Sequence, residues 1–403
     1  MTPDSTRITQ QQLESYLWGA ATLLRGLIDA GDYKQFIFPL LFFKRLCDVF
    51  DEELEVALAE SGSDLDYAYF AENHRFQIPR EAHWHAVRQT TSNLGRGIQA
   101  AFRQIEKANG TRLTGIFGDA QWTNKERLTD ATLRDLMEHF ATLTLSLKNV
   151  PEDELGHAYE YLIKKFADDS GHTAAEFYTN RTLVHLMTRM LDPQPGESIY
   201  DSTCGSGGML LSAAIQVRGQ GKEYRSMKLF GQERNLMTSA IARMNLFLHE
   251  IEDFQIERGD TLADPKFLEG DKLRQFDVVL ANPPYSIKQW NRDAWESDRY
   301  GRNIYGVPPQ GRADFAFLQH IVTIHQFASE NGPLRRPVPA RRSIPRRGTV
   351  YAPPPGGARH CRMCVGAGAE PVLQLAHGSL RCCLPDEQAG RAASQDPVHQ
   401  RPQ

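Results

Sequence analysis

The residues Asn282, Pro283, Pro284 and Tyr285 form a short segment with the groups needed to hold a planar amine. The side-chain oxygen of Asn282 and the carbonyl of Pro283 can both accept N–H bonds, while Tyr285 can stack on an aromatic ring. Two acceptors on an aromatic NH₂ group reduce its conjugation with the ring and leave its lone pair more nucleophilic. The segment therefore favours chemistry on the exocyclic amine of a base, although an ordinary strand-ending turn can have the same residues.

The element that must position this segment is the apolar run before it, residues 278–281 (Val-Val-Leu-Ala). A short, uncharged apolar run that stops at a breaker is typical of a buried parallel strand. Proline has no N–H for a sheet ladder, so Pro283 and Pro284 end the strand. The segment is therefore predicted at the C-terminal edge of a parallel sheet, where open α/β sheets bind ligands.

Three other predicted strands also end near acidic residues. They are residues 198–200 before Asp201, residues 227–231 before Glu233, and residues 254–257 before Asp260. In a doubly wound sheet these ends would meet at one edge. There Asp201 can bond a polar ligand group, Glu233 the hydroxyls of a ribose, and Asp260 an adenine amine.

A glycine-rich turn follows the first of these strands and leads into a predicted helix, residues 209–217. A strand, a glycine turn and a helix in this order form the nucleotide-binding unit of doubly wound folds. The spacing differs from the Gly-x-Gly-x-x-Gly of dinucleotide enzymes and no phosphate-binding lysine follows, which argues against an oxidoreductase and against a P-loop. We expect the turn to approach a bound cofactor through Cys204, Gly205, Ser206, Gly207 and Gly208.

A further loop leads into the apolar helix predicted over residues 183–191. Because the N-terminus of a helix attracts anions, this loop is a candidate site for the carboxylate of a ligand. Its residues are Glu176, Phe177, Tyr178, Thr179, Asn180 and Arg181.

The first 150 residues have a helical pattern without convincing strands. Apolar residues recur at helical spacing from about residue 8 to 50, from 93 to 107 and from 130 to 147. We therefore expect a helical domain over 1–150 and a nucleotide-binding α/β domain over 151–332. Basic residues scattered through the first domain are interpreted mainly as solvated surface charges: Arg75, Arg80, Arg88, Arg96 and Arg103.

Composition sets few limits on function. The chain has 403 residues, and 46 Lys and Arg against 50 Asp and Glu give a formal net charge of -4, which neither requires nor excludes nucleic acid. No apolar run approaches the ~20 residues of a membrane span, and no signal peptide is recognisable, so we expect a cytoplasmic protein without membrane contact. Cys361 and Cys364 have the spacing of a pair of zinc ligands. Cys382 and Cys383 are adjacent and do not have the spacing of a second pair, so no metal is expected.

Residues 8–332 resemble the modification subunit of type I restriction-modification systems, an adenine-N6 DNA methyltransferase family. Residues 176–179 look like the loop that holds the methionine end of S-adenosyl-L-methionine. Residues 201–208 look like the motif Asp-Pro-x-Cys-Gly-Ser-Gly-Gly, with Ser202 in place of the usual proline. Glu233 corresponds to the ribose-binding acid, Asp260 to the adenine contact, and residues 282–285 to the catalytic motif.

The resemblance implies an α/β, Rossmann-like methyltransferase sheet after an all-helical domain, with methyl transfer from S-adenosyl-L-methionine to adenine N6. It implies double-stranded DNA as substrate, two modification subunits on each specificity subunit, and a restriction subunit as a further partner. A protein-glutamine or RNA methyltransferase could use the same Asn-Pro-Pro-Tyr segment, but such enzymes seldom have the long helical domain. A damaged, inactive copy of the modification subunit is another alternative.

The tail, residues 333–403, changes character abruptly and becomes rich in Pro, Arg, Gly and Cys. Its composition indicates a disordered segment. Codons compatible with residues 334–348 and 369–376, read one base out of register, give family-like sequence, which indicates a frameshift near Pro333. We therefore expect an incomplete sheet without its fifth to seventh strands. Residues 278–281 would then form a bare apolar edge, and the chain would be poorly soluble and inactive.

Overall fold

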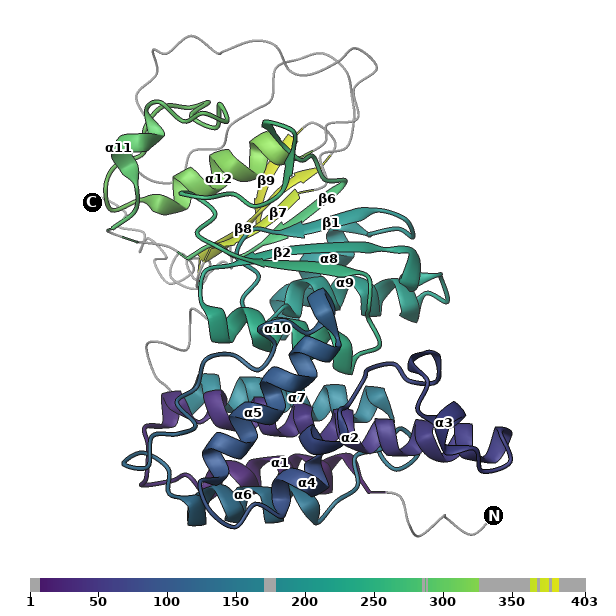
Figure 1. Ribbon diagram of the computed structural model, residues 1–403. Helices are drawn as coiled ribbons and strands as arrows, with labels where there is room; N and C mark the ends of the chain where they lie inside the picture. The colour runs from purple at the N-terminus through teal and green to yellow at the C-terminus, as the bar shows by residue number, and fades with distance from the viewer. Residues whose placement is uncertain are drawn as a thin grey trace, which may run out of the picture.

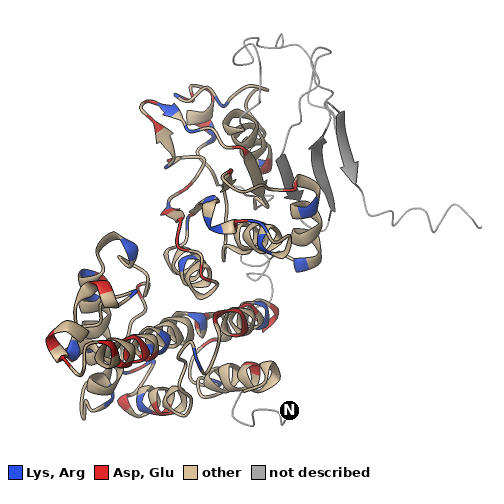
Figure 2. Cartoon of the chain, turned by 90° about the vertical axis from the view of Figure 1, so that its right-hand side faces the viewer, with Lys and Arg blue, Asp and Glu red and all other residues tan. Residues whose placement is uncertain are grey.

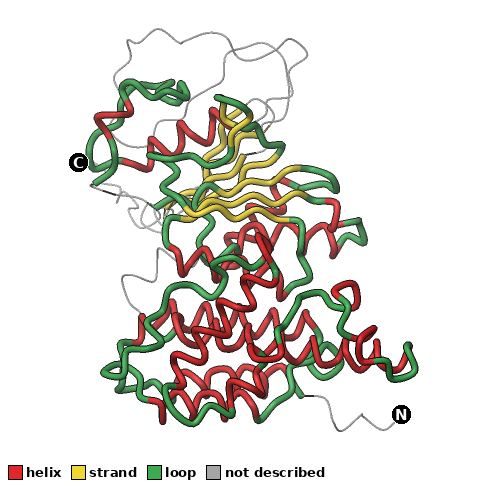
Figure 3. Tube along the Cα trace, in the orientation of Figure 1, coloured by secondary structure: helices red, strands yellow, loops and turns green. Residues whose placement is uncertain are grey.

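The computed structural model describes residues 8–169, 179–284, 287, 289–325 and the backbone of three strands between 363 and 383. A layer of helices lies on one side of a twisted sheet, and further helices cover the sheet's two faces (Figure 1). The helices of the layer come from the N-terminal part of the chain, and the strands come from the part after residue 197 (Figure 3). This arrangement confirms the predicted α/β sheet preceded by helices.

The helical layer is built from seven α-helices: α1 (Gln10–Thr22), α2 (Lys34–Glu60), α3 (Leu65–Ala68), α4 (Trp84–Arg88), α5 (Leu94–Ala108), α6 (Asp130–Ala141) and α7 (Glu152–Asp169). The central helix is α2, in which every residue from 36 to 50 is buried. Its buried charges have partners: Lys44 pairs with Asp48, and one terminal nitrogen of Arg45 donates to the carbonyls of Leu145, Ser146 and Val150 at 2.6–2.9 Å. Such pairing is what allows charged groups to remain in an apolar core.

Several of the scattered basic residues take part in local contacts on this layer. Arg75 pairs with Glu152 at 2.5 Å, Arg88 bonds to Glu138, and the guanidinium of Arg80 lies 4.2 Å from the centre of the Tyr69 ring. Arg96 and Arg103 are exposed. Lys and Arg are interspersed with Asp and Glu over the helices (Figure 2). The local pairs agree with the interpretation of these residues as surface charges.

The sheet has seven strands in the order β3-β2-β1-β6-β7-β8-β9. The first four strands in this order are parallel to one another: β3 (Phe254–Arg258), β2 (Lys228–Glu233), β1 (Ser198–Asp201) and β6 (Val278–Ala281). Two short strands, β4 (Leu268–Glu269) and β5 (Lys272–Leu273), pair separately. At the start of β1 and β6, Asp277 accepts bonds from the N–H and hydroxyl of Ser198 at 2.8 and 2.6 Å, which holds the two strands together there.

Alternate residues of the central strands face two different cores, as the period of two requires. Ile199, Leu229 and Val278 pack against α8 (Arg181–Leu191), α9 (Gly208–Gly219) and α10 (Leu236–Leu248). Tyr200 and Val279 face α12 (Ala313–Ile324) on the other side, next to the loop that contains α11 (Arg292–Trp295). Both faces of the central strands β1 and β6 are therefore covered, which explains the uninterrupted apolar sequence of β6.

One helix belongs to both halves of the molecule. Met244 and Phe247 of α10 lie in the same apolar cluster as α1, α2 and α7, while Ala242 and Leu246 lie in the cluster beneath the sheet. Arg243 of α10 also donates to the carbonyls of Thr114 and Arg112 at 2.6 and 2.7 Å. The helical layer is thus joined to the sheet by packing as well as by the chain.

The expectation of a bare apolar edge at β6 is wrong. Three strands from the tail extend the sheet: β7 (Met363–Ala367) is parallel to β6, and β8 (Glu370–Ala376) and β9 (Ser379–Cys383) follow as an antiparallel meander. An open edge of backbone N–H and C=O groups accepts any segment that can extend, and only two residues separate β8 from β9, the spacing of a tight hairpin. Disorder is therefore also wrong for these three segments. The expected insolubility loses its structural reason.

Candidate active site

The acidic and amide residues singled out in the sequence follow the ends of four neighbouring parallel strands. Asp201 ends β1 and Glu233 ends β2, while Asp260 follows β3 and Asn282 follows β6. Because the strands are parallel, these ends share one edge of the sheet. The structure does bring the four predicted positions to one side of the fold.

Asn282 is held by a residue from a distant segment. Its side-chain nitrogen donates to the hydroxyl oxygen of Thr179 at 3.1 Å, across 103 positions of sequence. Its side-chain oxygen is buried and has no hydrogen-bond partner among the described residues. A buried acceptor without a donor is costly in the absence of a ligand. The Asn282 oxygen is therefore an acceptor for an N–H group that the described residues do not supply.

The glycine turn is fixed by hydrogen bonds to the end of β2. The N–H of Cys204 donates to the carbonyl of Gln232 at 3.0 Å, and the N–H of Gly205 donates to the carboxylate of Glu233 at 3.1 Å. Gly205 and Gly207 have φ values of 53° and 77°, which a side chain would strain. These two glycines are required by the backbone of the turn, whatever the ligand.

The predicted cofactor acid Asp201 is fully buried beside this turn. Burial raises the pKa of its carboxyl to about 7, the N–H of Thr203 opposes that rise by donating to it at 3.0 Å, and the nearby charge of Glu233 adds to it. Because strongly shifted pKa values are concentrated at functional sites, the raised pKa of Asp201 supports its assignment to the candidate site.

Glu233 and Asp260 each use part of their carboxylate on the backbone. Glu233 accepts from the N–H of Asn235 at 2.8 Å in addition to Gly205. One oxygen of Asp260 accepts from the N–H groups of Leu262 and Ala263 at 3.0 and 3.2 Å, and the other lies 3.7 Å from Arg234. These bonds orient both side chains.

The loop before α8 is described only from Thr179 onward; Glu176, Phe177 and Tyr178 lie outside the described residues, as does Tyr285. Asn180 caps α8 by accepting from the N–H of Thr182 at 2.9 Å. Arg181 pairs with Glu160 and presses so closely on Gly208 that a Cβ there would lie 1.9 Å from its guanidinium. Gly208 is therefore needed for the approach of Arg181.

Sequence reasoning missed Arg302, a buried cation behind the site. It donates to the carbonyls of Thr261 and Leu262 at 2.9 and 2.8 Å and to the carboxylate of Asp298 at 2.6 Å. Its guanidinium also lies 4.5 Å from the centre of the Trp295 ring. Arg302 thus joins the loop after Asp260 to the loop around α11. The four-residue spacing from Asp298 was the only sequence signal for it.

Comparison with known proteins places these two halves in one family. Residues 13–140 match the family model described as HsdM N-terminal domain, and residues 150–332 match the one described as N-6 DNA Methylase. The chain is similar to the MjaIX methylase subunit of a type I restriction enzyme from Methanocaldococcus jannaschii, with 28% identity over 77% of this chain and 58% of the relative. The chain belongs to the family of type I restriction-modification methylase subunits.

Other members of this family agree in sequence and in fold. The HindI methylase subunit of Haemophilus influenzae is 29% identical over 61% of this chain and 58% of its own length. The crystal structure of a type I restriction-modification methyltransferase subunit from Streptococcus thermophilus is 29% identical, with a TM-score of 0.65 over 79% of this chain and 72% of that one. The chain thus covers 58% of the length of both curated relatives.

No helix in the described part of the chain is long and apolar enough to cross a membrane.

Proposed function

We propose that residues 8–332 of this chain belong to the modification subunit of a type I restriction-modification system, an enzyme that methylates adenine N6 in DNA with S-adenosyl-L-methionine as donor. The observation that carries this proposal is the amide of Asn282, which is held by Thr179 at the end of β6 and whose buried oxygen has no partner in the described part of the chain. Family membership supports the same activity. The match of residues 13–140 to the HsdM N-terminal domain favours DNA over RNA or a protein glutamine as substrate.

Asn282 and Pro283 act on the amine of the target base. The base must leave the duplex, because its N6 is otherwise inside the base pair. The side-chain oxygen of Asn282 and the carbonyl of Pro283 then accept hydrogen bonds from the two N–H groups of N6. This leaves the nitrogen lone pair available to attack the methyl group. Tyr285, outside the described residues, is proposed to stack on the base.

S-adenosyl-L-methionine supplies an electrophilic methyl group when bound. The residues that would hold it are those around the glycine turn. Asp201, Glu233 and Asp260 provide carboxylate acceptors at three strand ends, and Gly205 and Gly207 allow the turn between them. Thr179, Asn180 and Arg181, with residues 176–178, are proposed to face its methionine end. No metal is needed in this scheme.

The partners are proposed from the family. The substrate is double-stranded DNA in the cytoplasm, a specificity subunit selects the target with two modification subunits bound to it, and a restriction subunit can join. On the helical layer, the exposed Arg96 and Arg103 are candidate DNA contacts.

We further infer that the tail results from a lost or gained base near codon 333. The match to N-6 DNA Methylase stops at residue 332, one residue before the proposed position. The alternative function is therefore an inactive copy of the same subunit.

The test of the site is the substitution Asn282→Ala in a frame-restored chain assayed with its specificity subunit. Methyl transfer to DNA should fall by at least ~10², while the affinity for S-adenosyl-L-methionine stays nearly unchanged. Asn291→Ala is the matched control, because Asn291 is exposed and its side chain makes no cap bond. Equal loss of methyl transfer and cofactor affinity in Asn282→Ala would show that Asn282 is structural.

A further inference from the structure

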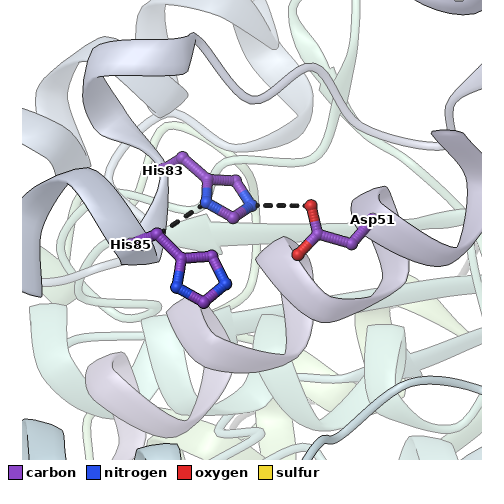
Figure 4. A group of neighbouring side chains, drawn as sticks. All are labelled: Asp51, His83 and His85. Carbon is purple, nitrogen blue, oxygen red and sulfur yellow. Dashed lines mark hydrogen bonds and ion pairs between the residues drawn. The ribbon is translucent and has the colours of Figure 1, made fainter.

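We propose that Asp51, His83 and His85 form a binding site for a divalent transition-metal ion on the helical layer. The three side chains come from two segments: His83 faces Asp51, and the ring of His85 lies beside that of His83 (Figure 4). One ligand atom from each residue can be chosen so that all three lie within 4.8 Å of one another. Two imidazoles and a carboxylate are a donor set that suits zinc, nickel or copper.

The site is positioned by helices that are well packed beneath it. Asp51 lies in α2 directly after the buried run 36–50. His83 and His85 stand at the start of α4, which is anchored by the buried Trp84 between them. The two imidazole rings are stacked, with centroids 5.3 Å apart and planes 24° from parallel. Both backbones are therefore fixed, and only side-chain rotations separate the present arrangement from coordination.

The distances are compatible with one ion. Zinc lies about 2.0–2.2 Å from N and O ligands, so two ligand atoms on a tetrahedral ion are about 3.4 Å apart. Nε2 of His83 is already 3.0 Å from a carboxylate oxygen of Asp51. The remaining adjustment falls on His85, which is exposed and can rotate.

The proton on His83 does not prevent binding. Its Nδ1 accepts the N–H of His85 at 3.3 Å, so the neutral ring has its proton on Nε2, facing Asp51. Coordination through Nε2 moves that proton to Nδ1, a change of tautomer with no change of charge. The long bond at Nδ1 is lost and a metal–nitrogen bond is gained.

An ion here would tie α2 to α4 across the intervening segment of residues 61–83, which contains α3. With three protein ligands it would keep at least one position for water. The site lies in the helical layer, whereas the proposed methyl-transfer site lies at the sheet edge (Figure 1). The ion would therefore cross-link α2 and α4, and the inference is independent of the proposed methyl transfer.

The test is equilibrium dialysis of the full, untagged 403-residue chain against Zn²⁺, followed by metal analysis and thermal melting. We expect one Zn²⁺ per chain, a higher melting temperature when it is bound, and no displacement by excess Mg²⁺, which prefers oxygen ligands. His85→Ala should weaken binding at least ~10-fold without disturbing the His83 cap or the His83–Asp51 pair. Asp51→Asn should weaken it similarly.

His157→Ala is the matched control, because it removes an exposed imidazole from α7 outside the cluster. Retained binding in this variant supports the site. Unchanged Zn²⁺ affinity in His85→Ala, or the absence of saturable binding to the unmodified chain, would overturn the proposal.

Discussion

Thr179 sets the direction of the Asn282 amide, the proposed catalytic group. Its hydroxyl oxygen accepts from the Asn282 nitrogen, so the Asn282 oxygen must point away from it. In Thr179→Val the amide can rotate and present its nitrogen to the base. We expect kcat for methyl transfer to fall roughly 10-fold, with a smaller change in KM for DNA and with activity restored in Thr179→Ser. Failure of the serine variant to restore kcat would show that the methyl group, and not the hydroxyl, matters.

Asp201 should make the protein less stable as the pH rises. In the unfolded chain an aspartate loses its proton near pH ~4, whereas in the folded protein the pKa is about 7. The folded state therefore holds the proton more tightly, and this contribution is complete below pH ~4 and is lost as the pH rises through about 7.

Asp201→Asn removes this pH dependence. Between about pH 5 and about pH 8, the free energy of unfolding measured in urea should fall by on the order of 2 kcal/mol more in the unmodified chain than in the variant. The variant should also bind S-adenosyl-L-methionine more weakly, because a carboxylate has been replaced. Parallel pH profiles for the two proteins would contradict the raised pKa.

Among the elements, the approach of α7 to α10 depends on one glycine. A Cβ on Gly156 of α7 would lie 2.4 Å from the ring of His249, the buried residue that ends α10. Gly156→Ala should therefore lower the free energy of unfolding in urea by ~1–3 kcal/mol through overpacking. Gly219→Ala, at the end of α9 with open space around it, should change it by no more than ~0.5 kcal/mol. Equal effects would mean that His249 moves aside freely.

Elements with a strong apolar period or a clear boundary could be predicted from the sequence. The helices α5, α8 and α9 and the strands β1, β3 and β6 lie close to their predicted ranges, because caps, glycines and prolines mark their ends, whereas α6 ends six residues before its predicted end at residue 147. Because these strand boundaries were predicted, the four polar residues at the strand ends could also be placed at one edge of the sheet.

The rest depends on tertiary contacts that leave little local signal. Strand β7 pairs with β6, β8 with β7 and β9 with β8, and their sequences have no regular apolar period. Arg302 and the pairing of Asn282 with Thr179 depend on residues brought together only by the fold. The histidine and aspartate cluster was missed because its members come from separate segments.

At the scale of the whole molecule, the reading frame near codon 333 is open to test. Resequencing should reveal a missing or additional base there, and restoring it should give a chain that methylates DNA with its specificity subunit. The 403-residue chain should be inactive in the same assay, because residues 333–403 replace the family sequence that follows the matched region. A methylating 403-residue chain, with its tail verified by peptide mass, would contradict the predicted inactivity.

Because α10 packs into two apolar clusters, it connects the helical layer directly to the sheet. Its outer side packs with the helical layer, and from its inner side Asn245 donates to the carbonyl of Ser206 in the glycine turn at 3.1 Å. A displacement of the helical layer therefore reaches the turn without passing through the linker near residue 150. If a ligand bound at the turn changes the affinity of the helical layer for a partner, thermodynamic linkage requires the partner to change the affinity of the turn for that ligand by the same factor.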